Sequence, residues 1–228
     1  MTRILGLLLS CALAGLAVPA RAANPPPAGP QTEADKTAYA IGQLVSGNLK
    51  TFNFTRREIQ MVQAGLGDGL KGVKSPLNID EYRAKAQALQ TERMAATAAK
   101  AKEAGNSYRE QAAKDKDTET TPSGIIITTL AAGAGAAPSA TDQVKVNYEG
   151  ALIDGTVFDS SIKRGQPMTF KLSAVVPCWT EALQHMKVGG KARIVCPPES
   201  AYRDRGQPPT IPGGSTLVFN VELLDIVK

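Results

Sequence analysis

The side chains that most often carry out chemistry in enzymes are scarce in this sequence. The chain has one histidine, His185, and its three cysteines form no C-x-x-C pair, so a zinc site is not expected. It also lacks the G-x-S-x-G elbow that presents a nucleophilic serine. No catalytic partner stands beside His185, so we expect it to be structural or at the surface. These residues point away from nucleophilic and metal-assisted reactions, and no cofactor is expected.

The C-terminal half instead carries aromatic and apolar side chains with a few polar groups among them. Taken singly, each has an ordinary explanation, because most would be core residues of any β domain and an aspartate is typical of turns. Their joint order along the chain makes them candidates for the residues of a binding or catalytic site. They are Tyr148, Phe158, Asp159, Met168, Val175, Val176, Trp179, Tyr202, Ile211 and Phe219.

An antiparallel sheet with one short helix is predicted to position these residues. β-Branched and alternating apolar segments are separated by glycine-rich turns, and Asp154-Gly155 is a strong hairpin signal. A short helix from about 179 to 186 ends at Gly189-Gly190. The expected strands are 125–130, 144–148, 157–158, 168–172, 192–196 and 217–227.

Three helices are predicted before the sheet. Their apolar residues recur at helical spacing, and Thr55 and Asn78 are each followed three residues later by glutamate, which is the signature of a capping box. Two short helices and the start of a third give a small core, so we expect a homodimer formed through residues 33–90 to supply the missing burial. The expected helices are 33–49, 55–70 and 78–116.

Two features of the helical part have competing explanations. Beyond Leu89 the third helix consists of Ala, Lys, Glu and Gln with nothing large to bury, which predicts a solvated stalk; a frayed linker is the alternative. The glycine cluster at 65–69 lies within a helical pattern. No strand precedes it and no G-K-[ST] follows, so we favour close helix packing over a nucleotide site.

The N-terminus is predicted to be a cleaved export signal. Arg3 precedes an uncharged apolar run over 4–18, which is followed by an A-x-A cleavage signature. A lipoprotein site at Cys11 is the alternative, although the run before it would be unusually short. We expect residues 1–22 to be removed near Ala22. The mature chain would then be periplasmic or secreted and soluble, with outer-membrane association left open.

Charge and cysteine content narrow the function further. Removing Arg3 and Arg21 with the signal lowers the formal net charge from +5 to +3, and the basic residues form no patch with aromatic residues between them. A nucleic-acid partner is therefore not expected. Loss of Cys11 leaves Cys178 and Cys196, for which export favours a structural disulfide over two buried free thiols or a redox pair.

Five motifs, in order, resemble the FK506-binding-protein family. They are VKVNYEG at 144–150, DGTVFDSS at 154–161, VVPCW at 175–179, AY at 201–202 and TLVFNVEL at 216–223. The N-terminal part is similar to the family's exported dimeric branch, the macrophage-infectivity-potentiator and FkpA type. The less specific motifs that carry this second resemblance are YAIG at 39–42, NLK at 48–50 and GLGDGL at 65–70.

The resemblance implies a peptidyl-prolyl cis/trans isomerase. An X-Pro amide rotates across a resonance barrier of about 18–20 kcal/mol, and neither a nucleophile nor a metal is needed because no bond breaks. The fold implied is α+β, with a helical dimerisation domain and a long stalk helix over 23–117. An isomerase domain over 118–228 then wraps an antiparallel sheet on one short helix.

Site roles follow from the same resemblance. Trp179 would be the floor under the proline ring, and the Val176 N–H and the Tyr202 hydroxyl would meet substrate carbonyls. Asp159 would orient polar groups at the rim. The catalytic set is Tyr148, Phe158, Asp159, Val176, Trp179 and Tyr202, and the substrate-binding set is Met168, Val175, Ile211 and Phe219.

Three residues depart from the family pattern. Cys178 stands where glycine is usual, Met168 where an aromatic residue is common, and Arg203 where glycine usually follows the pocket tyrosine. Cys178 and Cys196 bracket the pocket helix and the strand after it. The resemblance therefore implies a disulfide that ties the Trp179 end of that helix to the strand.

Two functions compete on this basis. The first is an isomerase that speeds folding of exported proteins; its partners would be proline-containing unfolded polypeptides, and FK506- or rapamycin-like macrolides would be candidate inhibitors. The second is a dimeric client-binding chaperone with weak or dispensable isomerase activity. A purely structural envelope protein is disfavoured, because the pocket residues are complete.

Overall fold

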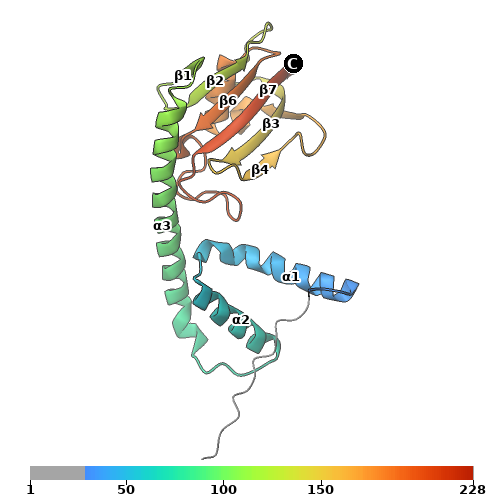
Figure 1. Cartoon of the computed structure of the whole chain (residues 1–228), viewed down its shortest axis with the longest axis vertical. Helices are drawn as coiled ribbons and strands as arrows, with labels where there is room; N and C mark the ends of the chain where they lie inside the picture. The colour runs from blue at the N-terminus through green and yellow to red at the C-terminus, as the bar shows by residue number, and fades with distance from the viewer. Residues whose placement is uncertain (1–28, 228) are drawn as a thin grey trace, which may run out of the picture. The chain divides into compact units, whose positions relative to one another are not determined.

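The computed structural model describes residues 29–227, so the predicted signal peptide, Cys11 and the cleavage site near Ala22 lie outside the described residues. Helices come first and a sheet follows, as predicted (Figure 1). Of the described residues, those at 29–41 and those at 42–227 belong to separate compact units. The helices are α1 (Glu33–Leu49), α2 (Arg56–Leu70), α3 (Ile79–Ala112) and α4 (Pro177–Ala182), with 3-10 turns η1 (Lys50–Phe52), η2 (Leu172–Ala174), η3 (Leu183–His185) and η4 (Pro198–Ser200).

A single antiparallel sheet of seven strands forms the C-terminal part. The strand order is β1-β2-β6-β7-β3-β4, and β5 pairs with the other end of β3. The α+β class is therefore confirmed, whereas the domain boundary at 117 stays a prediction. The strands are β1 (Thr118–Thr120), β2 (Ile126–Ala131), β3 (Gln143–Leu152), β4 (Val157–Ser160), β5 (Met168–Lys171), β6 (Lys191–Cys196) and β7 (Leu217–Val227).

The sheet has one large buried face and a smaller buried area on the opposite face, next to the end of α3, and successive residues of a strand serve opposite sides. On β2, Ile127 belongs to the larger cluster together with α4, whereas its neighbour Ile126 belongs to a smaller cluster with Ala112 at the end of α3. On β7, Phe219 and Val218 divide in the same way. Two-sided burial explains the short unbroken apolar runs at this place, which are 125–127 and 217–219.

Of the two predicted capping boxes, the one at Thr55 is correct and the one at Asn78 is wrong. At α2 the Thr55 hydroxyl accepts from the Glu58 N–H at 3.3 Å, and the Glu58 carboxylate accepts from the Thr55 N–H at 2.6 Å, so the capping box is confirmed. At α3 the Asn78 side chain makes no cap bond and donates to the Glu81 carboxylate at 2.7 Å instead. The Asn78 amide bonds this carboxylate in place of a cap bond, because a hydrogen bond to a charged acceptor is stronger than one between neutral groups.

The predicted solvated stalk needs correction, because one side of α3 is buried against the C-terminal sheet and the loop that precedes β7. Three small residues spaced by seven, Ala98, Gly105 and Ala112, are its buried positions. The side chain of Arg109 donates to the Thr216 hydroxyl at 2.9 Å. Small side chains let a helix approach its neighbour closely, so this contact needs none of the large apolar residues whose lack predicted solvation.

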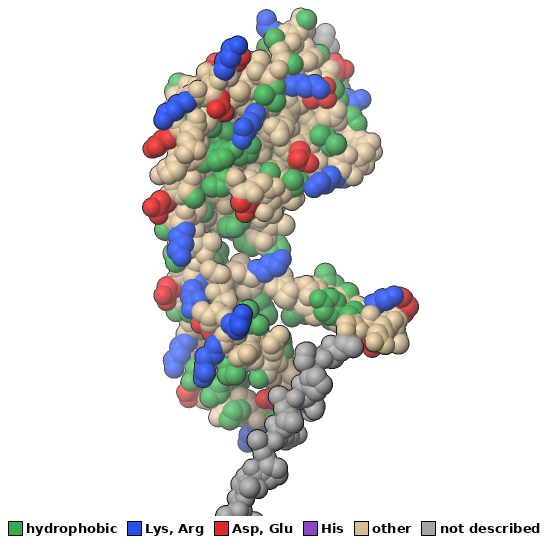
Figure 2. Space-filling view, viewed as in Figure 1, with side chains coloured by type: hydrophobic (Ala, Val, Ile, Leu, Met, Phe, Trp, Pro, Cys, Tyr) green, Lys and Arg blue, Asp and Glu red, His purple; other side chains and the backbone are tan. Residues whose placement is uncertain are grey.

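The glycine cluster of α2 makes no close contact within the described chain, so its predicted close packing stays a prediction. We predicted close helix packing at 65–69, but within the described chain nothing lies within 4 Å of the position that a Cβ would take on Gly65, Gly67 or Gly69. Hydrophobic side chains lie at the surface of the helical part (Figure 2), and Leu70 at the end of α2 is 90% exposed. Any close packing of this segment therefore requires a surface outside the described chain.

The contact at Gly105 makes a prediction about stability. A Cβ at this position would lie 2.3 Å from the Thr216 hydroxyl oxygen, which is closer than any atom pair tolerates. We expect Gly105→Ala to lower the free energy of unfolding by roughly 0.5–2 kcal/mol, even though alanine favours helices, because overpacking costs more than the propensity gain. Urea unfolding measures it.

Glu103→Ala is the matched control, since Glu103 lies exposed on the same helix. A gain in stability on Gly105→Ala would show that α3 does not pack on the sheet in solution.

Candidate active site

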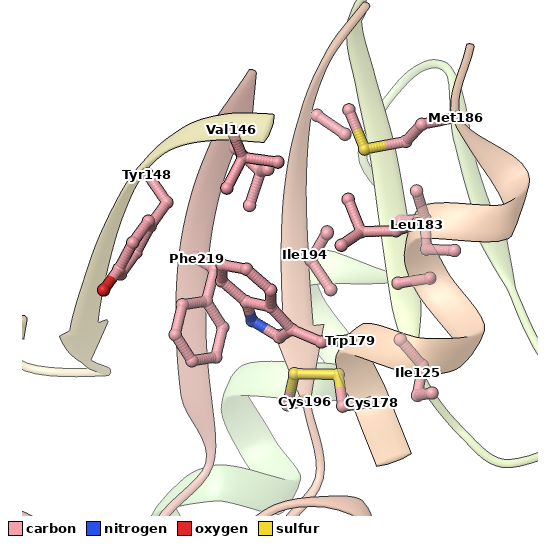
Figure 3. Packing of buried hydrophobic residues seen from close by; sticks show 14 of the residues in the cluster. Ile125, Val146, Tyr148, Cys178, Trp179, Leu183, Met186, Ile194, Cys196 and Phe219 are labelled. Carbon is pink, nitrogen blue, oxygen red and sulfur yellow. A yellow bond between two sulfur atoms is a disulfide. The ribbon is translucent and has the colours of Figure 1, made fainter. Parts of the chain in front are cut away.

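Trp179 lies at the centre of a group of aromatic rings on the α4 side of the sheet (Figure 3). Its indole is 4% exposed and meets three rings edge-on, at centroid distances of 5.1 Å to Tyr148, 5.6 Å to Phe170 and 5.3 Å to Phe219. Edge-to-face contacts at these distances are the preferred geometry of aromatic pairs. We call these rings, together with Phe158, the Trp179 cluster.

Phe158 joins the cluster through Phe219, with ring centroids 5.6 Å apart. Both rings lie over Gly150 of β3. A Cβ on Gly150 would come within 2.7 Å of the Phe219 ring and 2.8 Å of the Phe158 ring. Only glycine leaves room for two rings at this point. The glycine of the first C-terminal motif is thus part of the site.

All ten predicted site residues come together. Tyr148, Trp179, Ile211 and Phe219 are buried in one core cluster, and the remaining apolar members pack against it half-buried. Asp159 reaches the group by bonding to Tyr148. Phe170 was missed because it stands in an alternating strand with no further signal. His185 lies elsewhere and pairs with Glu119 at 2.9 Å.

The polar edge of the site is a triangle of Tyr148, Asp159 and Arg164. The Tyr148 hydroxyl and the Arg164 guanidinium each donate to one carboxylate oxygen of Asp159, and Arg164 also donates to the Tyr148 oxygen at 2.8 Å. Arg164 was not predicted. Its position five residues after Asp159, across a turn, is the only sign in the sequence that it reaches back.

The triangle sets the charge state of the edge. Partial burial raises the pKa of Asp159, but hydrogen bonds from Arg164 and Tyr148 and the positive charge of Arg164 lower it more, so the pKa lies below its ordinary value. Burial and the bond to Asp159 raise the pKa of the Tyr148 hydroxyl. At neutral pH the edge therefore presents an ionised carboxylate, an arginine and a neutral phenol.

The two predicted carbonyl-binding groups lie at the margin of the cluster. Burial, and then the negative charge of Asp159, raise the pKa of the Tyr202 hydroxyl, which keeps it a proton donor at neutral pH. Val176 is the N-cap of α4, and its carbonyl accepts from Trp179 and Thr180. The N–H of an N-cap residue takes no part in the helix, so it is available to another acceptor.

A disulfide links the floor of the site to the sheet. Cys178, next to Trp179 on α4, is bonded to Cys196 at the end of β6, with their Cα atoms 5.7 Å apart. Both cysteines are fully buried. The predicted disulfide is confirmed, and the alternative of two buried free thiols is wrong for this structure.

Comparison with known proteins now identifies the family. Residues 135–224 match the family described as FKBP-type peptidyl-prolyl cis-trans isomerase, and residues 34–126 match the domain amino terminal to it. A probable FKBP-type peptidyl-prolyl cis-trans isomerase of Haemophilus influenzae is 38% identical over 201 residues, covering 83% of each chain. The chain belongs to the FKBP-type peptidyl-prolyl cis-trans isomerases.

Other members of the family extend the similarity over both parts. The outer membrane protein MIP of Legionella longbeachae is 33% identical over 228 residues and 97% of each chain. The crystal structure of FkpA from Escherichia coli superimposes with a TM-score of 0.66 at 38% identity, covering 86% of this chain and 97% of that chain. The resemblance drawn from the motifs, and isomerase activity with it, are thereby confirmed.

The charge state of Asp159 makes this isomerase's stability depend on pH. A carboxylate with a lowered folded pKa stabilises the protein above its unfolded value of about 3.9 and loses that contribution as pH falls through the folded pKa. We expect the difference in urea midpoint between the native protein and Asp159→Asn to shrink between about pH 6 and about pH 3.

In Arg164→Met the carboxylate loses a partner that lowers its folded pKa, so that pKa moves toward the unfolded value and the effect of Asp159→Asn on the urea midpoint should change less with pH. A pH-independent difference between the native protein and Asp159→Asn would contradict the assigned charge state.

Proposed function

We propose that the X-Pro amide rotates over the Trp179 cluster, with the proline ring on the indole. The observation that supports this is one buried indole surrounded by aromatic rings, beside a margin that carries donors. A twisted amide has lost resonance and is less polar than a planar one, so an apolar surface favours it over both planar isomers. No proton transfer or covalent step is required.

Polar groups at the margin would complete the site. The Tyr202 hydroxyl and the Val176 N–H are donors for the carbonyls of the bound segment, and they act most strongly if they fit the twisted geometry. Asp159 and Arg164 hold the Tyr148 ring in place, so we assign them positioning roles. Met168, Val175 and Ile211 would contact the residues that flank the proline.

Removal of one hydroxyl tests the proposed donor. We expect Tyr202→Phe to lower kcat/KM for a short X-Pro peptide by about three- to tenfold, the value of one hydrogen bond, with the folded state unchanged. A protease-coupled isomerisation assay on the full chain measures it. Trp179→Ala should lower the same constant further.

Tyr108→Phe is the matched control, because that hydroxyl bonds Arg193 on the far side of the sheet. If Tyr202→Phe and Tyr108→Phe lower kcat/KM equally, the loss comes from reduced protein stability, and the donor role of Tyr202 is refuted.

A second function, client holding by the helical part, has its own support. Twelve large apolar residues between α1 and the start of α3 are exposed, far more surface than a monomer ordinarily leaves open. The same residues fit the homodimer expected through 33–90. They are Tyr39, Ile41, Leu44, Val45, Ile59, Met61, Leu66, Leu70, Val73, Leu77, Ile79 and Tyr82.

The dimer makes a prediction of its own. Leu44 is 78% exposed. In a two-fold interface the same residue is present on both subunits, so one substitution places two altered side chains in the interface. We expect Leu44→Asp to weaken association by about 3 kcal/mol or more, over a hundredfold in Kd, as measured by sedimentation.

Leu130→Asp, on a β2 leucine that is 58% exposed, should leave the association unchanged. If Leu44→Asp has the mass of the native protein, residues 33–90 do not form the interface.

Clients, inhibitors and location follow as proposals from the same family. Proline-containing unfolded polypeptides are the natural substrates of such a site, and FK506- or rapamycin-like macrolides are candidate inhibitors. Within residues 29–227, no helix combines the length and apolar character that crossing a bilayer requires. We assign the mature chain to the periplasm or the outside of the cell, with outer-membrane association left as the alternative.

A further inference from the structure

A cavity of about 270 Å³ lies beside the proposed active site, between the helical part and the loop that precedes β7. One side is formed by η1 and by Met94 and Thr97 of α3. The other side is the loop, which contributes Ile211 and three prolines, Pro208, Pro209 and Pro212. Typical small-molecule sites measure about 300–1,000 Å³, so this volume suits one or two side chains of a polypeptide.

The helical wall of the cavity is held by side-chain bonds from α3. Arg93 donates to the carbonyl of Asn53 at 3.1 Å and forms an ion pair with Glu58 at 3.0 Å. Gln90 donates to the Thr51 hydroxyl at 2.8 Å. Since Thr51 and Asn53 both line the cavity, this wall is fixed before anything binds.

The loop wall is anchored as firmly. Gln207 and Ile211 exchange backbone hydrogen bonds at 2.8 and 3.0 Å, and Lys102 of α3 pairs with Asp204 at 2.5 Å. A Cβ on Gly213 would lie 2.0 Å from the Asp204 carbonyl and 3.5 Å from Ala98, so the loop lies directly on α3. Because both walls are held in place, little of the entropic cost of binding comes from ordering the protein.

The charged residues that line the cavity are all positive. Lys50 and Arg205 are its charged residues, it contains no acidic side chain, and its other large members are apolar. Within residues 29–227 neither cation takes part in an ion pair. Such a lining is complementary to an apolar side chain with a carboxylate next to it.

Ile211 connects the cavity to the active site. Its side chain is 2% exposed, lines the cavity, and belongs to the same core cluster as Trp179. One side chain is therefore shared by the lining of the cavity and the core around the indole, which places the two next to each other.

We propose that this cavity is a second subsite for the client chain. It takes an apolar side chain adjoining an acidic residue, in the same polypeptide whose proline lies over Trp179. The inference rests on the proposed function, because it takes the position of the proline from it. It predicts that the enzyme selects clients by sequence beyond the residues that flank the proline.

Matched peptides test the subsite with the full-length protein. Each contains one X-Pro bond and, at increasing distance on the N- or C-terminal side, either Leu-Glu or Leu-Lys; a short X-Pro peptide without the extension is the reference. At one spacing we expect kcat/KM to favour Leu-Glu over Leu-Lys by about three- to tenfold, the effect of one or two partly exposed ion pairs.

Charge reversal assigns the preference to the cavity. In Lys50→Glu/Arg205→Glu the preference should invert, with the rate on the short peptide unchanged, because both side chains are exposed and lie outside the proposed catalytic set. Lys114→Glu/Lys145→Glu makes the same change in net charge at exposed positions away from the cavity. This control should retain the native preference.

The outcomes separate the subsite from the active site. No preference at any spacing, or an equal loss in both charge-reversed proteins, overturns the subsite while the short-peptide rate preserves the isomerase. If Lys50→Glu/Arg205→Glu instead dissociates the protein without altering peptide preference, the cavity belongs to a second copy and the inference falls. Failure of the native protein to turn over the short peptide would overturn the proposed function and the subsite with it.

Discussion

The packing of one indole governs the C-terminal domain. Trp179 is buried among rings contributed by β3, β5 and β7, so α4 can dock only where these strands bring their aromatic residues to the same face. A buried tryptophan removes about 150–250 Å² from water, more than any other side chain of this core. The same ring is the proposed floor of the active site. The core that stabilises the domain and the surface that would bind proline are therefore one group of residues.

Because the same residues form the core and the proposed site, the short helix α4 that carries Trp179 needs additional stabilisation. The helix has six residues, too few to be stable alone, and it begins at Pro177, whose fixed φ suits a first helical position. The disulfide from Cys178 to Cys196 then fixes its start to β6. An apolar surface can favour a twisted amide only if it keeps its shape, and a covalent link beside the indole supports that shape more directly than packing alone.

The long helix connects the parts of the chain to which the two proposed functions are assigned. Through Ala98, Gly105 and Ala112 it lies against the sheet, and through Arg93 and Gln90 it holds the segment between α1 and α2. A helix held at its middle and along its C-terminal half transmits position between these two contacts. The loop that carries Ile211 lies on the same helix, so the helical part contributes to one wall of the region beside the proposed active site.

Sequence reasoning succeeded where the signal is local or where a motif fixes several residues together. The Thr55 capping box, the alternation in β3 and the ordered motifs around Trp179 are of this kind. It failed where the deciding contact is remote. The face of α3 at Gly105 is defined by Thr216, more than a hundred residues away, and small residues carry no hydrophobic signal. Arg164 was missed because only the turn after β4 returns it to Asp159.

The aromatic centre has one more consequence, for spectroscopy. Trp179 is the only tryptophan in the chain. Emission excited at the red edge of protein absorption therefore arises from this ring alone, with the tyrosines silent. The proposed active site thus carries its own fluorophore, and occupancy of the indole face can be followed in the unlabelled full-length protein.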